Sequence, residues 1–137
     1  MTRRGLIFIG LAAPLFADDS REVWELLAQV AGALSEGNID EFLQAFDRAM
    51  PEYRALELNV SSLLRQYDVR SSIEPLDEET KGLTHIVDLD WLLELIEQQD
   101  NTNITRRRER IHCEVVKRGK AWKVTKIEPI AFFAPPK

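Results

Sequence analysis

An alternation of apolar and polar residues that starts at Leu83 constrains the fold of this chain more than any other feature. Every second residue falls on a side that is apolar apart from one histidine: Leu83, His85, Val87, Leu89, Trp91, Leu93 and Leu95. Asp88, Asp90 and Glu94 fall on the opposite side. Because successive side chains of a β-strand point to opposite faces, the pattern predicts a strand from Leu83 to about Glu97 with one buried face.

Three more strands are predicted beside it, over residues 67–73, 104–117 and 121–128. Proline cannot donate to a ladder, so we expect the first of these to end at Pro75, before the acidic loop 77–79. Ile127 breaks the alternation of the last strand, as a β-bulge does. Strands of about fourteen residues greatly exceed the usual length of about 5–6, so the sheet must curl strongly to remain on a small domain.

Three amphipathic helices are predicted before the sheet. The first, over residues 20–36, carries apolar residues at helical spacing and has Asp19 as its N-cap. Asn38 caps a short second helix, and Pro51 occupies the first turn of a third, which reaches Leu64. Amphipathic helices need an apolar surface to cover, and the apolar side of the strands supplies it.

The predicted fold class is therefore α+β, with three N-terminal helices packed on a strongly curved antiparallel sheet of about four strands. A chain of 137 residues suits one such domain. Its 45% hydrophobic and 30% charged residues are typical of a globular protein and exclude wholesale disorder.

Residues 1–17 are predicted to be a signal peptide. Two arginines precede an almost unbroken apolar run from Gly5 to Phe16, which ends at Ala17, and this order is typical of secretory signals. The run is too short to cross a bilayer core of ~30 Å. We therefore expect cleavage after Ala17, a domain over residues 18–137, and an exported protein, periplasmic or secreted, that does not contact the membrane. The alternative is an apolar strand or helix of the domain itself.

Charge is divided unevenly along the chain. Residues 18–102 contain 6 Lys and Arg against 20 Asp and Glu, whereas residues 103–126 contain 9 against 2. A basic segment of this kind is one mark of nucleic-acid binding. The pairing of the strands gives it a different explanation.

Pairing the second and third strands across the turn at 98–103 sets Asp90 opposite Arg110 and Glu94 opposite Arg106. A slip by one residue would mix apolar and charged side chains on each face. We therefore predict a ladder of cross-strand ion pairs on the outer face, each worth a few tenths to about 1 kcal/mol. Nucleic-acid binding is not expected, because it needs an unopposed basic surface.

Two charged residues and one histidine fall on the apolar face. In the predicted register Arg107 and Glu109 lie beside Trp91, where they either project beyond the core or line a polar patch within a cavity. His85 is either an ordinary buried residue or a functional one. Glu109 and His85 are the candidate general bases of an enzyme.

Four aromatic residues extend this candidate site. Tyr53, Tyr67, Trp91 and Trp122 either wall a ligand cavity or belong to the ordinary core. Together with the charged pair described above, they are the predicted ligand-binding residues, and the expected ligand is a small apolar molecule.

Metal and cofactor chemistry is not expected. His112 and Cys113 are adjacent on one strand and therefore point to opposite faces, and the chain has only two histidines. Cys113 is the only cysteine, which excludes an internal disulfide, and we expect it to be a small buried residue. The sequence contains no phosphate-binding loop or nucleophile motif.

Three stretches of the sequence resemble the nuclear transport factor 2-like superfamily. They are Leu34-Ser35-Glu36-Gly37-Asn38 followed by Glu41-Phe42-Leu43, the helix over residues 51–64, and Gly119-Lys120-Ala121-Trp122-Lys123-Val124. The resemblance covers residues 19–130 and implies a cone-shaped, cystatin-like arrangement. The superfamily includes ketosteroid isomerases, scytalone dehydratases, epoxide hydrolases and polyketide cyclases beside binding and dimerisation modules, so it implies no single activity.

The sequence leaves two functional hypotheses open. The first is a non-catalytic module that binds a small apolar molecule in its cone cavity or a protein partner on its sheet face. On that face Thr84, Ile86, Leu92 and Val116 accompany the ion pairs and favour a homodimer. The alternative is a small cofactor-free enzyme of the isomerase, dehydratase or hydrolase type, with a carboxylate or histidine acting in the cavity.

Overall fold

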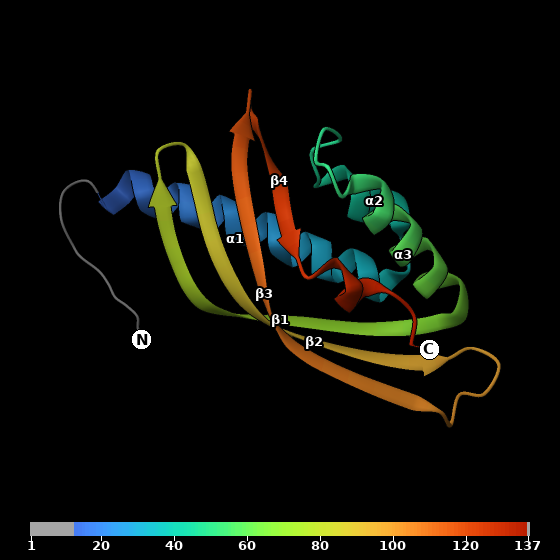
Figure 1. The fold of residues 1–137 in the computed structure, drawn as a ribbon. Coiled ribbons are helices and arrows are strands. Elements are labelled where there is room, and N and C mark those ends of the chain that lie inside the picture. Colours follow the sequence, from blue (N-terminus) through green and yellow to red (C-terminus); the bar gives the residue numbers. More distant parts are fainter. Residues whose placement is uncertain (1–12, 137) are drawn as a thin grey trace.

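A computed structural model describes residues 13–136, which form one curved sheet with helices on one side (Figure 1). The elements in chain order are α1 (Ala13–Glu36), α2 (Ile39–Gln44), α3 (Tyr53–Gln66), β1 (Tyr67–Lys81), β2 (Thr84–Glu97), β3 (Ile104–Arg118), β4 (Ala121–Glu128) and the short 3₁₀ helix η1 (Ile130–Phe133). The predicted α+β class, with three N-terminal helices and a four-stranded antiparallel sheet, is confirmed.

Helix α1 is longer than the sequence predicts. It begins at Ala13 rather than at Ser20, so the helix runs through Asp19, and the capping role predicted for that residue is wrong. Pro14 does not prevent the earlier start. Proline lacks a backbone N–H, but in the first turn of a helix that group would have no partner within the helix. The predicted signal peptide lies mostly outside the described residues, and its cleavage stays a prediction.

Local hydrogen bonds set the start of the second and third helices. The backbone N–H of Glu41 donates to Oδ1 of Asn38 over 3.0 Å, which confirms Asn38 as the N-cap of α2. Pro51, predicted to lie inside α3, instead precedes its first residue, Tyr53. A turn that begins at Asp47 delays the start of this helix.

The sheet is antiparallel, with strand order β1-β2-β3-β4. The register of β2 and β3 is the predicted one, with Asp90 opposite Arg110 and Glu94 opposite Arg106. Strand β2 starts one residue later than predicted, because Leu83, which is 85% exposed, belongs to the preceding turn.

Strand β1 continues past Pro75 through the predicted acidic loop, so its predicted end is wrong. An edge strand tolerates proline, since half of its N–H groups have no partner strand, and the register shifts between Pro75 and Asp77. The bulge predicted near Ile127 is confirmed: the β3–β4 register shifts between Glu114 and Val115, and Ile127 is buried.

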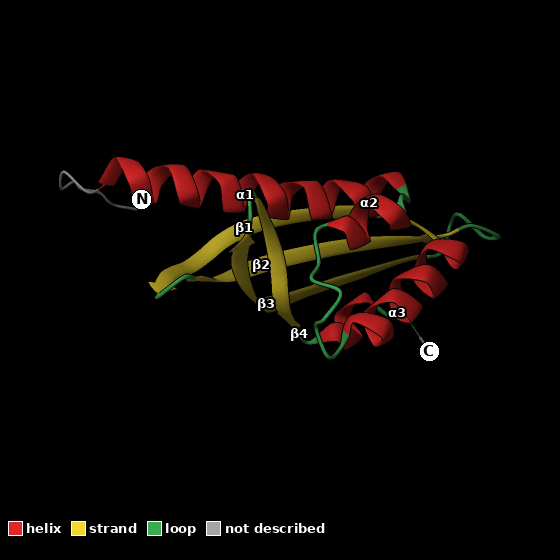
Figure 2. Cartoon of the chain, turned by 90° about the horizontal axis from the view of Figure 1, so that it is seen from above, coloured by secondary structure: helices red, strands yellow, loops and turns green. Residues whose placement is uncertain are grey.

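All helices lie on one side of the sheet, called the inner face, and no described helix covers the other, called the outer face (Figures 1 and 2). Alternate residues of β2 are buried on the inner face: Val87, Leu89, Trp91, Leu93 and Leu95. They pack with apolar residues of the helices, including Leu27, Leu34, Phe42, Leu56 and Leu63. Burial of this apolar surface is the main favourable term in folding.

Helix η1 is not predicted by the sequence pattern, because four residues are too few to show a helical period. Its residues Phe132 and Phe133 are nevertheless only 3% and 0% exposed. They pack against Trp91 on the inner face. Residues 129–136, which contain η1, are called the plug segment below.

Replacement of the N-cap residue, Asn38→Ala, is expected to lower the free energy of unfolding by about 1 kcal/mol, because the N–H of Glu41 loses its side-chain acceptor. Urea denaturation followed by circular dichroism measures the change. The control Asn101→Ala, in the exposed turn after β2, should leave the midpoint unchanged. An unchanged midpoint for Asn38→Ala would contradict the capping role.

Candidate functional site

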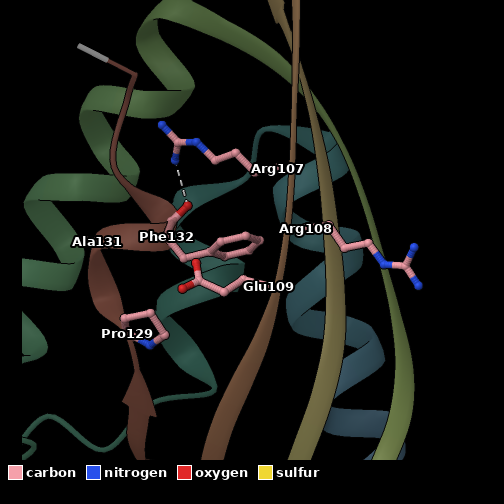
Figure 3. Close-up of a pocket in the computed structure, with 6 residues that line it drawn as sticks. All are labelled: Arg107, Arg108, Glu109, Pro129, Ala131 and Phe132. Atoms are coloured by element: carbon pink, nitrogen blue, oxygen red, sulfur yellow. Dashed lines mark hydrogen bonds between the residues drawn. The ribbon is translucent and has the colours of Figure 1, made fainter.

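Arg107 and Glu109 lie on the inner face of β3, at a pocket of about 380 Å³ (Figure 3). In the β2–β3 register they stand opposite Leu93 and Trp91. The pocket is lined by Arg107, Arg108, Glu109, Pro129, Ala131 and Phe132. Arg107 is half-buried and Glu109 is exposed, so the pair lies at the mouth of this pocket. Its role in binding stays a prediction.

The guanidinium of Arg107 is bound to the plug segment. Its Nη1 donates to the carbonyl oxygen of Phe132 over 2.7 Å, a bond drawn in Figure 3. The same nitrogen donates to the carbonyl oxygen of Ala134. Two backbone acceptors of the plug segment therefore meet at one nitrogen of one side chain.

Arg107 differs electrostatically from the arginines on the outer face of the same strand. Among the described residues it forms no ion pair, whereas each of those arginines does. Partial burial lowers the pKa of the Arg107 guanidinium below its ordinary value, against the opposing influence of Tyr67 and Glu109. Within residues 13–136, its hydrogen bonds go to backbone carbonyl oxygens and not to a carboxylate.

Aromatic rings fill the inner face beside this pocket. Trp91 is fully buried and meets Phe133 edge-on with ring centroids 5.1 Å apart, and Phe132 meets Phe133 edge-on at 5.2 Å. Nε1 of Trp91 donates to Oγ of Ser71 over 2.8 Å, so its polar group is satisfied. Sequence reasoning missed both phenylalanines, although the apolar run 130–133 was a signal for burial.

His85 lies on the inner face far from this pocket and is only 4% exposed. The ring of Trp122 meets it edge-on at 5.3 Å, and its Nε2 lies 3.9 Å from a carboxylate oxygen of Glu78. The other oxygen of Glu78 accepts from Nε1 of Trp24 over 3.5 Å, which links α1 to the sheet. Along β2, at about 3.3 Å per residue, His85 is roughly 20 Å from Trp91, which stands opposite Glu109. The two candidate bases, His85 and Glu109, therefore do not share a site.

The remaining predicted ligand-binding residues lie apart from one another. Tyr53 lines a pocket of about 510 Å³ between α2, α3 and β4. Trp122 lines another of about 430 Å³, and its Nε1 donates to Oε1 of Glu22 over 2.8 Å. Tyr67 is half-buried at the start of β1, near Arg107. The predicted set therefore does not wall a single cavity.

Ion pairs cover the centre of the outer face. Three arginines of β3 each bind an acid of β2 at 2.6–2.8 Å: Arg106 with Glu94, Arg108 with Asp90, and Arg110 with Asp88. The predicted ladder is present, but only the first pair is directly opposite. The other two are diagonal, because a long side chain reaches the diagonal neighbour. The arginine of the third pair also binds Asp77 of β1.

His112 lies next to these ion pairs. Its Nδ1 is 2.8 Å from an oxygen of Asp88, and its Nε2 is 3.0 Å from an oxygen of Glu114. Ionised carboxylates only accept hydrogen bonds, so both ring nitrogens must carry a proton for both bonds to form. Burial lowers the pKa of His112, but the hydrogen bonds to Glu114 and Asp88 outweigh it and raise the pKa above its ordinary value.

Cys113 is buried, as the sequence predicts, and burial raises the pKa of its thiol. Among residues 13–136, no group of three or more His, Cys, Asp and Glu side chains is arranged to hold a metal ion. None of the helices in this described range is both long and apolar enough to cross a membrane.

The fold is shared with solved structures of distant sequence. A nuclear transport factor 2-like superfamily protein from Salmonella enterica has a TM-score of 0.70 at 9% identity, covering 82% of this chain and 89% of that one. A scytalone dehydratase-like protein from Novosphingobium aromaticivorans has a TM-score of 0.75 at 10% identity, covering 84% and 85%. An NTF-2-like protein of unknown function from Shewanella oneidensis has a TM-score of 0.58 at 12% identity, and the match covers 80% of this chain and 96% of that one. No protein-family model matches the sequence, and no match is found among curated proteins.

The geometry at His112 predicts a pH-dependent stability. Because the pKa of His112 is raised above 6.5 in the folded state, the stabilisation from its two hydrogen bonds is fully present below pH 6.5. This stabilisation is lost as the pH rises through the folded-state pKa. The urea midpoint of the protein should therefore fall over that range, and His112→Gln should reduce the fall. Identical pH profiles for the two proteins would show that these hydrogen bonds contribute nothing.

Proposed function

We propose that this chain, which has the nuclear transport factor 2-like fold, is a non-catalytic binding module whose outer sheet face associates with a second copy of itself. The observation that carries the proposal is the division of charge across that face. Strands β1 and β2 contribute mostly acids, such as Glu74, Glu79 and Asp90, beside two bases, Arg70 and Lys81. Strands β3 and β4 contribute mostly bases, such as Arg108 and Lys126, beside two acids, Glu114 and Glu128.

This division makes the face complementary to itself. A two-fold axis that runs along the strands between β2 and β3 places the acidic half of one copy on the basic half of the other. Strands β1 and β4 are separated by two strands, roughly 14 Å at about 4.8 Å per step, so their charges are too far apart to pair within one copy. Charge complementarity of this kind orients the partners and favours their association.

Apolar side chains between the charges supply surface to bury. Ile86, Leu92 and Ile96 of β2 and Val116 of β3 are half-buried on the outer face, and Ile104 is 47% exposed. A second copy would remove these groups from water, which is favourable. The outer face thus combines apolar side chains, which lie between and beyond its ion pairs, with complementary charge.

The state of the inner face also supports the outer face as the binding surface. Trp91 and the rings of the plug segment occupy the inner face beside Arg107. The enzyme alternative needs a base at a substrate cavity, but Glu109 is exposed and His85 is packed against Trp122. The alternative is therefore the less supported of the two.

We also propose that the domain is exported after removal of residues 1–17. A cut after Ala17 would leave Asp18 and Asp19 at the start of α1, where acidic residues are stabilising. It would also change the formal net charge from −5 to −7, because two arginines are lost.

Sedimentation equilibrium at high micromolar concentration is expected to give twice the monomer mass. Leu92→Arg should give a monomer, because it places a second positive charge opposite Arg108 at the centre of the contact. Added salt should weaken the dimer, since it screens the charges between the copies.

Leu58→Arg is the matched control for this experiment. Leu58 is 56% exposed on α3, away from the outer face, so the variant should remain a dimer. Circular dichroism establishes that both variants are folded. A wild-type protein that sediments as a monomer would overturn the outer-face proposal.

Fusion of residues 1–24 to a reporter enzyme that is active only outside the cytoplasm tests the export proposal. The fusion should be active, and N-terminal sequencing of the product should begin at Asp18. Ala17→Asp should leave the fusion uncleaved, because the cleavage site requires a small residue. An intact, inactive wild-type fusion would count against export.

A further inference from the structure

We propose that the plug segment occupies, as an internal ligand, a binding site for an aromatic carboxylate. The site lies beside Arg107 on the inner face, so it does not depend on the dimer contact, which is on the outer face. Two kinds of contact made by the plug segment define the chemistry of the ligand that would replace it.

Arg107 supplies the polar part of the site. Its Nη1 donates to the carbonyl oxygens of Phe132, over 2.7 Å, and of Ala134. A carboxylate oxygen could accept from this nitrogen in place of a carbonyl oxygen, and the hydrogen bond would then be between two charged groups, which is stronger. Among the described residues Arg107 has no ion-pair partner. The carbonyl dipoles balance its positive charge only in part, and a carboxylate would supply a full negative charge.

Phe132 and Phe133 supply the apolar part. Both are buried, and Phe133 meets the edge or face of two other rings, Trp91 at 5.1 Å and Phe42 at 6.1 Å. Aromatic surroundings of this kind suit another aromatic group. A ligand with a fused ring system and one carboxylate would replace the ring contacts of the plug segment and take over hydrogen bonding to Arg107.

Few bonds from outside hold the plug segment in place. The plug segment is not a strand of the sheet. Among the described residues only two side chains outside it donate hydrogen bonds to it, those of Arg107 and Asn59. Nδ2 of Asn59, in α3, lies 3.2 Å from the carbonyl oxygen of Ile130. Its backbone bonds close turns within the segment itself. A pocket of about 380 Å³ already opens between Arg107 and Phe132 (Figure 3). Beyond these hydrogen bonds, the packing of Phe132 and Phe133 holds the segment, and this packing is what the ring system of a ligand would have to replace.

Glu109 gives the site a second, opposing feature. It lines the same pocket as Arg107, and its carboxylate repels an incoming anion. Its charge therefore sets how tightly a carboxylate is held. Removal of this charge should strengthen binding of an anionic ligand and leave binding of an uncharged one unchanged.

Isothermal titration calorimetry with 2-naphthoate, and with 2-naphthalenemethanol as the uncharged analogue, tests the proposal. Phe132→Ala, which vacates ring space beside Arg107, should bind naphthoate more tightly than the wild type does. Adding Arg107→Gln should weaken naphthoate binding about tenfold, because a charge-assisted hydrogen bond is lost, and should leave the alcohol unaffected. Glu109→Gln in the Phe132→Ala background should increase the affinity for naphthoate only.

Arg106→Gln in the same background is the matched control, since Arg106 is the neighbouring arginine on the outer face. It should leave naphthoate binding unchanged. Equal affinities for acid and alcohol, or a naphthoate affinity insensitive to Arg107→Gln, would overturn the proposal. A folded Phe132→Ala protein that binds neither compound would overturn it as well.

Hydrogen exchange on the wild-type protein decides the question if Phe132→Ala does not fold. Naphthoate at saturating concentration should speed exchange of the backbone N–H groups of Phe132 and Ala134, whose bonds close the turns of the plug segment. Exchange in β2 should stay the same. Unchanged or slower exchange at these two groups would mean that the ligand does not displace the plug segment.

Discussion

The pairing of β2 with β3 in a single register is the constraint on which the rest of the structure depends. A slip of one residue would turn Asp88 and Asp90 toward the buried rings of the inner face, and an unpaired buried carboxylate is costly. In the observed register the acids of β2 face the arginines of β3, so the outer face needs no helix to cover it. The apolar inner face does need cover, and this requirement fixes where the helices and the plug segment pack.

Arg107 is the exception within that register, and its partners come from outside the ladder. Its neighbours Arg106 and Arg108 point to the outer face and bind acids of β2. Arg107 points to the inner face, where β2 offers only Leu93 opposite it. A half-buried guanidinium needs acceptors, and the carbonyl groups that follow β4 provide them. One charged residue in β3 is thus tied to the path of the chain after the sheet.

Elements with a strong period were predictable from the sequence, and elements that depend on distant contacts were not. The alternation in β2 predicted the register and the inward direction of Arg107. The continuation of β1 past Pro75 was missed, because it depends on the position of β1 at the edge of the sheet. That error put Glu78 in a loop, whereas it lies beside His85. Helix η1 was missed because its burial depends on contact with Trp91, far away in sequence.

The candidate site was predictable only where strand parity decided the outcome. Parity placed Arg107 and Glu109 on the inner face together with Trp91, and the structure brings these three close together. Tyr53 and Trp122 were grouped with them by residue type alone, and the loops that connect their elements carry them to other pockets. Strand alternation specifies a face, whereas position along a face depends on how whole elements pack.

Alternation along β3 also separates the two proposed binding surfaces. Arg106 and Arg107 are adjacent in the chain, yet their side chains lie on opposite faces, so a change at one reaches the other only through the backbone. At these positions the backbone of β3 is held by its ladder with β2, whereas β4 pairs with β3 only over residues 112–118. Release of the plug segment would therefore leave the outer ion pairs in place. The fold accommodates a contact between copies on one face and an internal ligand on the other, with little energetic coupling between them.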